Sequence, residues 1–215
     1  MEGPEIPYPS SGMSLPASAR ALVIGGTGPT GPAIVSGLEH RGLTVTLFHT
    51  GRHEVDEVAH VEHLHGDPFS AEGVTEALSD RTFDVVVACY GRLRAIAEVL
   101  SGRCDRFVSV GGTPAYRGYF DPTRFDPPGL PIPTAEDAPR STQDDDGKSY
   151  RVARTEDLLF EHQPAAIHLR YPFVYGPRQI APLDWCIVRR VLDRRAAIIL
   201  PDAGLAAETR SFSGN

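Results

Sequence analysis

Three regularly spaced glycines follow an apolar run near the start of the sequence. Gly25, Gly28 and Gly31 follow RALVI, and Gly31 opens the segment GPAIVSGLEHRG, whose apolar residues have helical spacing. In such a turn the first glycine allows the tight bend, the second lets the backbone approach a diphosphate, and the third lets helix and strand pack closely. The helix N-terminus adds N–H groups and a positive dipole end. Residues 25–31 are therefore predicted to bind a dinucleotide, with Thr27, Pro29 and Thr30 in the same turn.

The end of the next apolar run predicts which dinucleotide is preferred. Enzymes that prefer NAD usually carry an acidic residue here, which binds the ribose 2′-hydroxyl. This sequence reads LFHTGRHE, with His49 in the expected acidic position and Arg52 shortly after it. Because a guanidinium pairs well with a 2′-phosphate, we expect both residues to contact the cofactor and NADP to be preferred over NAD.

The elements that must position these residues alternate along the chain. Apolar runs predict strands over 20–26, 43–49, 83–90, 104–112, 165–176 and 196–201, and the more polar segment VEHLHGD predicts a further one over 61–67. Helical spacing predicts helices over 31–42, 71–81, 93–103, 149–162 and 183–195. Buried strands that alternate with helices indicate an α/β protein with a Rossmann-type, doubly wound parallel sheet covered on both faces.

Two segments interrupt this alternation. Residues 1–18 are rich in Pro, Ser and Gly, and we expect a disordered tail there. Residues 113–148 are crowded with Pro, Gly and Asp, and a loop of this length inside a compact domain is often functional.

The overall composition argues against several classes of protein. The net charge of -7 does not suit a nucleic-acid partner, and no apolar run approaches the roughly 18 residues that suggest a membrane span. The N-terminus does not resemble a secretory signal. Three scattered cysteines suit a reducing compartment, so we expect a cytoplasmic protein with free thiols.

Six segments, in order, resemble the extended short-chain dehydrogenase/reductase family, in its NAD-dependent epimerase/dehydratase branch. They are VIGGTGPTG, HGDPFS, RFVSVGGTPAY, PIPTAEDAP, YRVARTEDLL and LRYPFVYGPR, and the resemblance covers roughly residues 20–212. It implies that Asp67, beside Pro68, holds the adenine. The cofactor would also be flanked by Ala88, Cys89 and Tyr90 and, at the nicotinamide, by Pro172, Phe173 and Val174.

The catalytic residues of the family are only partly present. Family members use a Tyr-x-x-x-Lys pair on one helix face, in which the tyrosine transfers a proton and the lysine lowers its pKa and orients the ribose. Here Tyr150 stands in the tyrosine position, and Arg154 replaces the lysine. Gly112 falls where a Ser or Thr should polarise the substrate oxygen, and Thr113 is the nearest hydroxyl that could substitute for it.

The chain is also shorter than the resemblance implies. Family members continue for roughly another hundred residues, which build most of a C-terminal substrate domain. We therefore expect a dinucleotide-binding domain over 19–178 and only the beginning of a substrate domain over 179–215. Uncovered apolar residues between 183 and 200 would then favour self-association into a homo-oligomer.

No metal site is expected. His60, His63 and His65 lie close together, but this segment is predicted as loop and edge strand, without a fourth ligand nearby. The acidic run at 144–146 suits a solvated loop.

Two hypotheses about function remain. The first is an NADP- or NAD-dependent oxidoreductase or epimerase that acts on a small carbonyl or alcohol compound such as a nucleotide sugar, with Tyr150 as the acid and base. The alternative is a catalytically impaired NADP-binding module, a sensor or a subunit of an assembly, which the Arg154 and Gly112 departures favour.

Overall fold

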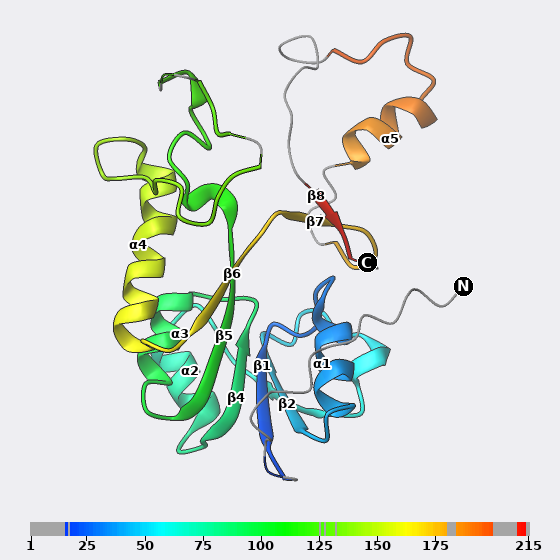
Figure 1. Cartoon of the computed structure of the whole chain (residues 1–215). Helices are drawn as coiled ribbons and strands as arrows, with labels where there is room; N and C mark the ends of the chain where they lie inside the picture. The colour runs from blue at the N-terminus through cyan, green and yellow to red at the C-terminus, as the bar shows by residue number, and fades with distance from the viewer. Residues whose placement is uncertain are drawn as a thin grey trace.

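The apolar runs of the sequence form the strands of one parallel sheet. The computed structural model describes residues 16, 18–124, 126, 128–131, 133–179, 184–199 and 210–213. The six strands lie in the order β3-β2-β1-β4-β5-β6 (Figure 1), which is the Rossmann order. Their bounds are β1 Arg20–Ile24, β2 Thr44–His49, β3 Glu62–His65, β4 Phe83–Ala88, β5 Cys104–Gly112 and β6 Ile167–Tyr171. The predicted fold class is therefore confirmed.

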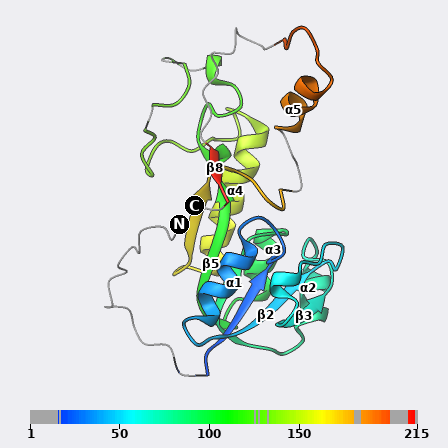
Figure 2. The ribbon, with the colours of Figure 1, turned by 90° about the vertical axis from the view of Figure 1, so that its right-hand side faces the viewer.

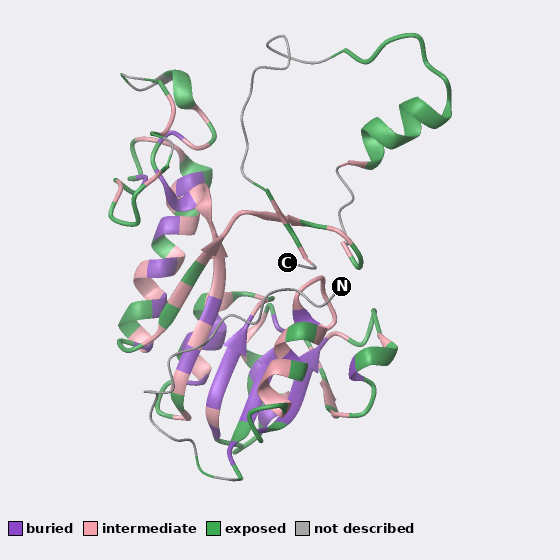
Figure 3. Ribbon diagram, turned by 45° about the vertical axis from the view of Figure 1, so that its right-hand side comes forward, coloured by how far each residue is buried: buried purple, intermediate pink, exposed green. Residues whose placement is uncertain are grey.

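Helices cover the two faces of the sheet unequally. The strand side chains alternate between the faces, so β1 contributes to two separate cores. Leu22 and Ile24 pack with the helices α2 (Ala71–Leu78), α3 (Leu93–Val99) and α4 (Gly147–His162). Ala21 and Val23 pack with α1 (Gly31–Glu39) on the opposite face. Burial is greatest in the central strands β1, β2 and β4 (Figure 3).

Side-chain caps explain where two of these helices begin. The hydroxyl of Ser70 accepts a hydrogen bond from the Gly73 N–H at 2.9 Å, at the start of α2. The Asp146 carboxylate accepts from the N–H groups of Lys148 and Ser149 at 3.0 and 3.1 Å, at the start of α4. The N-terminus of α1 differs, because Thr30 makes no side-chain cap. Its N–H groups are therefore not shielded by a capping side chain.

Among the residues that the structure describes, three short 3-10 turns lie in the connections. They are η1 Asp56–Val58, η2 Thr113–Ala115 and η3 Pro122–Arg124. The predicted long loop over 113–148 contains two of these turns, and α4 begins at its end.

The predicted strand over 165–176 is two strands in the structure. Pro172 has no N–H to continue the ladder, so β6 ends at Tyr171 and β7 (Phe173–Tyr175) begins after the proline. β7 leaves the main sheet and pairs in parallel with β8 (Arg210–Phe212).

The edge strand β6 is less covered than the sequence predicts. Its side chains Ile167 and Leu169 are 59% and 40% exposed.

The C-terminal segment makes few contacts with the sheet. Helix α5 (Trp185–Leu192) lies apart from the six strands in both views (Figures 1 and 2) and has no buried residue. The strand predicted over 196–201 is wrong for residues 196–199, because no neighbouring strand pairs with them, and residues 200–201 lie outside the described part. Of the predicted tail, only Pro16 and Ser18 are described. Within the described residues, none of the helices is both long and apolar enough to cross a bilayer.

Candidate functional site

Two of the three glycines in the turn after β1 are required by packing within the protein. Gly25 has a φ of +88°, and a Cβ at this position would lie 2.2 Å from the Cβ of Tyr90. A Cβ on Gly31 would lie 2.0 Å from the carbonyl oxygen of Gly26. Both distances are far below van der Waals contact, so the predicted roles of the first and third glycines agree with the geometry.

Gly28 has no such reason to be a glycine. A Cβ built there meets nothing closer than the Gly25 carbonyl oxygen at 3.8 Å, and its φ is not positive. Within the described chain, the N–H groups of Thr27 and Thr30 have no hydrogen-bond partner. Open space beside unpaired donors fits an anionic ligand whose phosphate approaches the backbone closely.

The prolines limit how many donors this turn can offer. The sequence predicts Pro29 near the helix start, and it lies directly before the N-cap Thr30 of α1, while Pro32 lies inside the first turn. Neither proline has an N–H, so the turn's unpaired backbone donors include those of Thr27 and Thr30 but none from Pro29 or Pro32. The turn therefore fits a diphosphate with few backbone hydrogen bonds.

A cavity of about 150 Å³ adjoins the turn, at the point where the strand order reverses between β1 and β4. Its lining is Gly25, Thr27, Gly28, Pro29, Thr30, His49, Thr50, His53, Cys89 and Tyr90. All except Thr50 and His53 are cofactor contacts that the sequence predicts; these two follow His49 on the same connection. Small-molecule sites are typically about 300 Å³ or more, so the cavity can hold only part of a dinucleotide.

His49 is held by hydrogen bonds at both ring nitrogens. It is 4% exposed; its Nδ1 accepts from the Gly51 N–H at 3.2 Å, and its Nε2 lies 2.9 Å from Nδ1 of His63. Burial lowers the pKa of His49 below its ordinary value, and the attraction of Glu54 opposes this shift. His49 therefore lines the cavity with an uncharged imidazole ring. Arg52 is exposed and does not line it.

The other predicted cofactor residues lie at the same edge of the sheet. The Asp67 carboxylate accepts from the Phe69 N–H at 2.9 Å, which closes a turn, and Pro68 is buried. Ala88 is only 2% exposed and packs within the hydrophobic core. Burial raises the pKa of the Cys89 thiol to about 11, which keeps it protonated and unreactive at neutral pH.

The predicted catalytic residues are not brought together in one cavity. Tyr150 is half-buried and Arg154 is exposed, both on α4. Thr113 and Pro172 line a different cavity of about 720 Å³, which Tyr116, Arg170 and Tyr171 also line. Tyr150 and Arg154 are not part of that lining. Phe173 and Val174 are half-buried in β7.

A buried ionic cluster that the sequence did not reveal joins α4 to β6. Arg170 donates to both carboxylate oxygens of Glu156 at 2.8 Å, and Arg140 donates to one of them at 3.2 Å. The His168 Nε2 lies 3.4 Å from Glu156, and its Nδ1 lies 2.8 Å from the Ser109 hydroxyl oxygen. Burial alone would raise the pKa of Glu156, but Arg170 and His168 outweigh it and lower the pKa to about 2.

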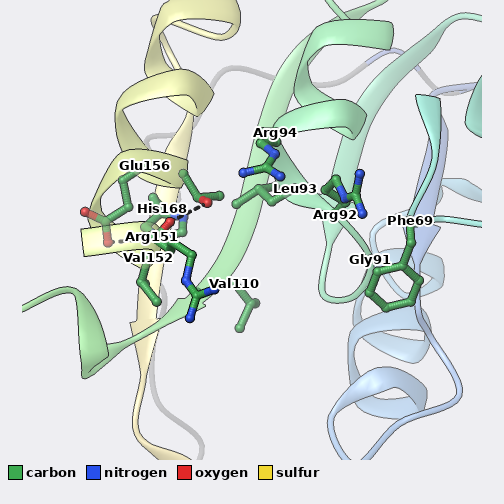
Figure 4. A pocket seen from close by; sticks show the side chains of 12 residues that line it. Phe69, Gly91, Arg92, Leu93, Arg94, Val110, Arg151, Val152, Glu156 and His168 are labelled. Carbon is green, nitrogen blue, oxygen red and sulfur yellow. Dashed lines mark hydrogen bonds and ion pairs between the residues drawn. The ribbon is translucent and has the colours of Figure 1, made fainter. Parts of the chain in front are cut away.

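Glu156 and His168 also line a third cavity, of about 360 Å³, between α3 and α4. Figure 4 shows Arg92 and Arg94 on the α3 side and Arg151 on the α4 side of this space. No pattern in the sequence predicts this cavity, because its residues come from separated segments that no motif unites.

Comparison with solved structures supports the fold. The Bordetella bronchiseptica enzyme WbmH in complex with NAD+ is similar with a TM-score of 0.63 and 16% identity, covering 82% of this chain and 63% of that one. The Thermus thermophilus UDP-glucose 4-epimerase complex with NAD has a TM-score of 0.65 and 21% identity, over 91% and 71% of the two chains. For the Thermotoga maritima UDP-glucose 4-epimerase with UDP-glucose these values are 0.68 and 17%, over 91% and 70%.

These identities are low, so the likeness shows the fold alone. The chain spans 62–63% of the length of three Bordetella structures that it matches. No protein-family model and no curated protein matches the sequence.

Proposed function

We propose that this chain binds a nicotinamide dinucleotide at the turn over residues 25–31, with NADP preferred over NAD. The observation that carries the proposal is the open space at Gly28, which the packing of the protein does not require to be a glycine. The unpaired N–H groups of Thr27 and Thr30 lie beside it, and the adjacent cavity is at the reversal point of the strand order. Several proteins of this fold have been solved with NAD.

We further propose an oxidoreductase or epimerase of the extended short-chain dehydrogenase/reductase type, acting on a carbonyl or alcohol carbon. The bound cofactor supplies a hydride acceptor or donor. Tyr150 holds and transfers the proton at its phenol oxygen, Arg154 provides a positive charge in place of the family's lysine, and Thr113 donates to the substrate oxygen. A nucleotide sugar is the proposed substrate class, since a solved protein of this fold contains UDP-glucose. Residues 19–178 would bind the cofactor and 179–215 would begin the substrate domain.

The second candidate is an NADP-binding module with impaired catalysis. The cavity that Thr113 lines does not include Tyr150, and Arg154 is exposed; both observations favour it. Such a chain would sense the cofactor or serve as a subunit of an assembly.

Turnover of NADPH separates these two candidates. In an assay with a panel of sugar nucleotides and ketones, the enzyme proposal expects wild-type turnover and a loss of about 100-fold or more in Tyr150→Phe, because the phenol proton is removed. Thr155→Val, five residues further along α4, is the matched control and should retain activity. If the wild type binds NADPH but turns over nothing, and Arg154→Lys gains activity, the impaired module is the correct interpretation.

The cofactor preference depends on Arg52. Calorimetry should show tighter binding of NADPH than of NADH, and Arg52→Ala should weaken NADPH about tenfold while leaving NADH unchanged, because only NADPH has a 2′-phosphate to pair with. Arg94→Ala, an exposed guanidinium outside the glycine turn, should change neither affinity. Equal wild-type affinities for the two cofactors would contradict the NADP preference.

We also propose that the chain self-associates through its exposed apolar residues. On α5, Val191 and Leu192 are 65% and 64% exposed. Light scattering should give a mass of at least two chains at micromolar concentration, and the double variant Val191→Glu/Leu192→Glu should shift it toward one chain. A single-chain mass for the wild type across the concentration range would refute this proposal.

A further inference from the structure

Three histidines gather at the carboxyl ends of two neighbouring strands. His63 and His65 are two residues apart on β3, so they share one face of the strand. His49 ends β2 and is the register partner of His65 in the parallel ladder. Glu54 lies on the connection that follows β2. The four side chains offer ligand atoms that all lie within 4.8 Å of one another.

Individual distances are close to those of a metal site. Glu54 Oε2 lies 3.3 Å from His63 Nδ1 and 3.8 Å from His49 Nε2, and Glu54 Oε1 lies 3.2 Å from His65 Nε2. In a tetrahedral zinc site with bonds of about 2.1 Å, neighbouring ligand atoms are about 3.4 Å apart. Reaching this geometry requires the 2.9 Å between His49 Nε2 and His63 Nδ1 to lengthen, and Glu54 and His65, whose side chains are half exposed, to adjust.

The hydrogen bonds around His63 already select the ligating form of its ring. Its Nε2 lies 2.9 Å from the Val58 carbonyl oxygen, which can only accept, so Nε2 carries the proton. The lone pair of Nδ1 then points toward Glu54 and His49. A metal-bound histidine typically donates its second N–H to a carbonyl in this way.

His49 must change its proton position when a metal binds. Without metal, its Nδ1 accepts from the Gly51 N–H, and its Nε2 donates to His63. Ligation by Nε2 requires the proton on Nδ1 instead, so the Gly51 N–H must turn away. Gly51 has a φ of +72° in a turn, where a glycine can reorient at low cost.

We propose that His49, Glu54, His63 and His65 bind one Zn²⁺ ion. Three imidazoles and one carboxylate suit zinc and similar transition metals, whereas Mg²⁺ and Ca²⁺ prefer oxygen ligands. The half-exposed Glu54 and His65 leave a path for the ion to enter from solvent. The sequence predicts no metal site because a fourth ligand is missing nearby, and the fold supplies both Glu54 and His49. This proposal does not depend on the proposed function.

Metal titration of the whole chain, free of any affinity tag and stripped with a chelator, tests the site directly. Calorimetry with ZnCl₂ should give one ion per chain with a dissociation constant of about 1 µM or tighter. Co²⁺ should give the strong visible absorption of a tetrahedral nitrogen and oxygen site. MgCl₂ should produce no binding heat.

Two variants assign the ligands. His65→Ala and Glu54→Gln alter half-exposed side chains, and each should weaken Zn²⁺ binding by tenfold or more with the fold intact by circular dichroism. His60→Ala is the matched control, because its imidazole pairs with Glu39 at 2.9 Å outside the cluster, and binding should be unchanged. The proposal is overturned if the wild type takes up no Zn²⁺ at about 100 µM. Unchanged affinity in both ligand variants would overturn it equally.

Discussion

Gly28→Ala should weaken the affinity for the cofactor strongly while leaving the fold intact. The new methyl group has room, since it meets no atom within 3.8 Å, so we expect the free energy of unfolding to stay within about 0.5 kcal/mol of the wild type. The same methyl occupies the space through which a diphosphate must approach the backbone. We expect NADPH affinity to fall at least about tenfold, or roughly 1.4 kcal/mol. Calorimetry and chemical denaturation measure the two quantities separately.

Two other glycine-to-alanine variants serve as controls for Gly28→Ala. Gly37→Ala adds a methyl group inside α1, where its nearest neighbour is the end of Arg41 at 3.6 Å, and should leave NADPH binding unchanged. Because alanine has a higher helix propensity than glycine, Gly37→Ala should raise the free energy of unfolding by about 0.5–1 kcal/mol. Gly31→Ala forces a Cβ to 2.0 Å from the Gly26 oxygen and should destabilise the fold by about 3 kcal/mol or more. If Gly28→Ala binds NADPH as well as Gly37→Ala does, the turn does not hold a diphosphate.

Glu156→Gln should destabilise the fold strongly, although the two side chains are nearly the same size. The wild-type carboxylate is 2% exposed and accepts from Arg170 and Arg140. The amide removes the negative charge and leaves two guanidinium groups without their buried partner. Breaking a buried pair in this way costs about 3–5 kcal/mol. Urea unfolding at pH 7 measures the loss, and Asp157→Asn is the control, since Asp157 is a half-exposed partner of Arg140 and should cost about 1 kcal/mol or less.

The same carboxylate should make stability depend on pH in acid. Its folded pKa of about 2 lies below the ordinary 4.5, so the folded state favours the ionised form. The resulting stabilisation is fully present above pH 4.5 and is lost as the pH falls from about 4.5 to about 2. The shift corresponds to about 3 kcal/mol, at roughly 1.4 kcal/mol for each pH unit. The difference in stability between wild type and Glu156→Gln should therefore shrink across this range. A difference that stays constant from about pH 7 to about pH 2.5 would contradict the assignment.

Much of the fold could be predicted from local patterns. The apolar runs that became β1, β2 and β4 are buried in the sheet, and residues 104–112 form a strand with the predicted bounds. The glycine spacing predicted a turn whose first and third members are fixed by packing. Errors came where a strand needs a partner: Pro172 divided one predicted strand, and residues 196–199 found no neighbour to pair with.

What the sequence by itself determined is the alternation of strands and helices and the glycine-rich turn after the first strand, since burial, helical spacing and glycine geometry act over a few residues. Tertiary structure alone decided three things. It showed that Gly28 is free of packing constraints, it joined Glu156 to Arg170 and Arg140, and it placed Glu54 beside the histidines of two strands. Each depends on atoms from separate segments, whose distances are set by the parallel sheet and its connections and not by spacing along the chain.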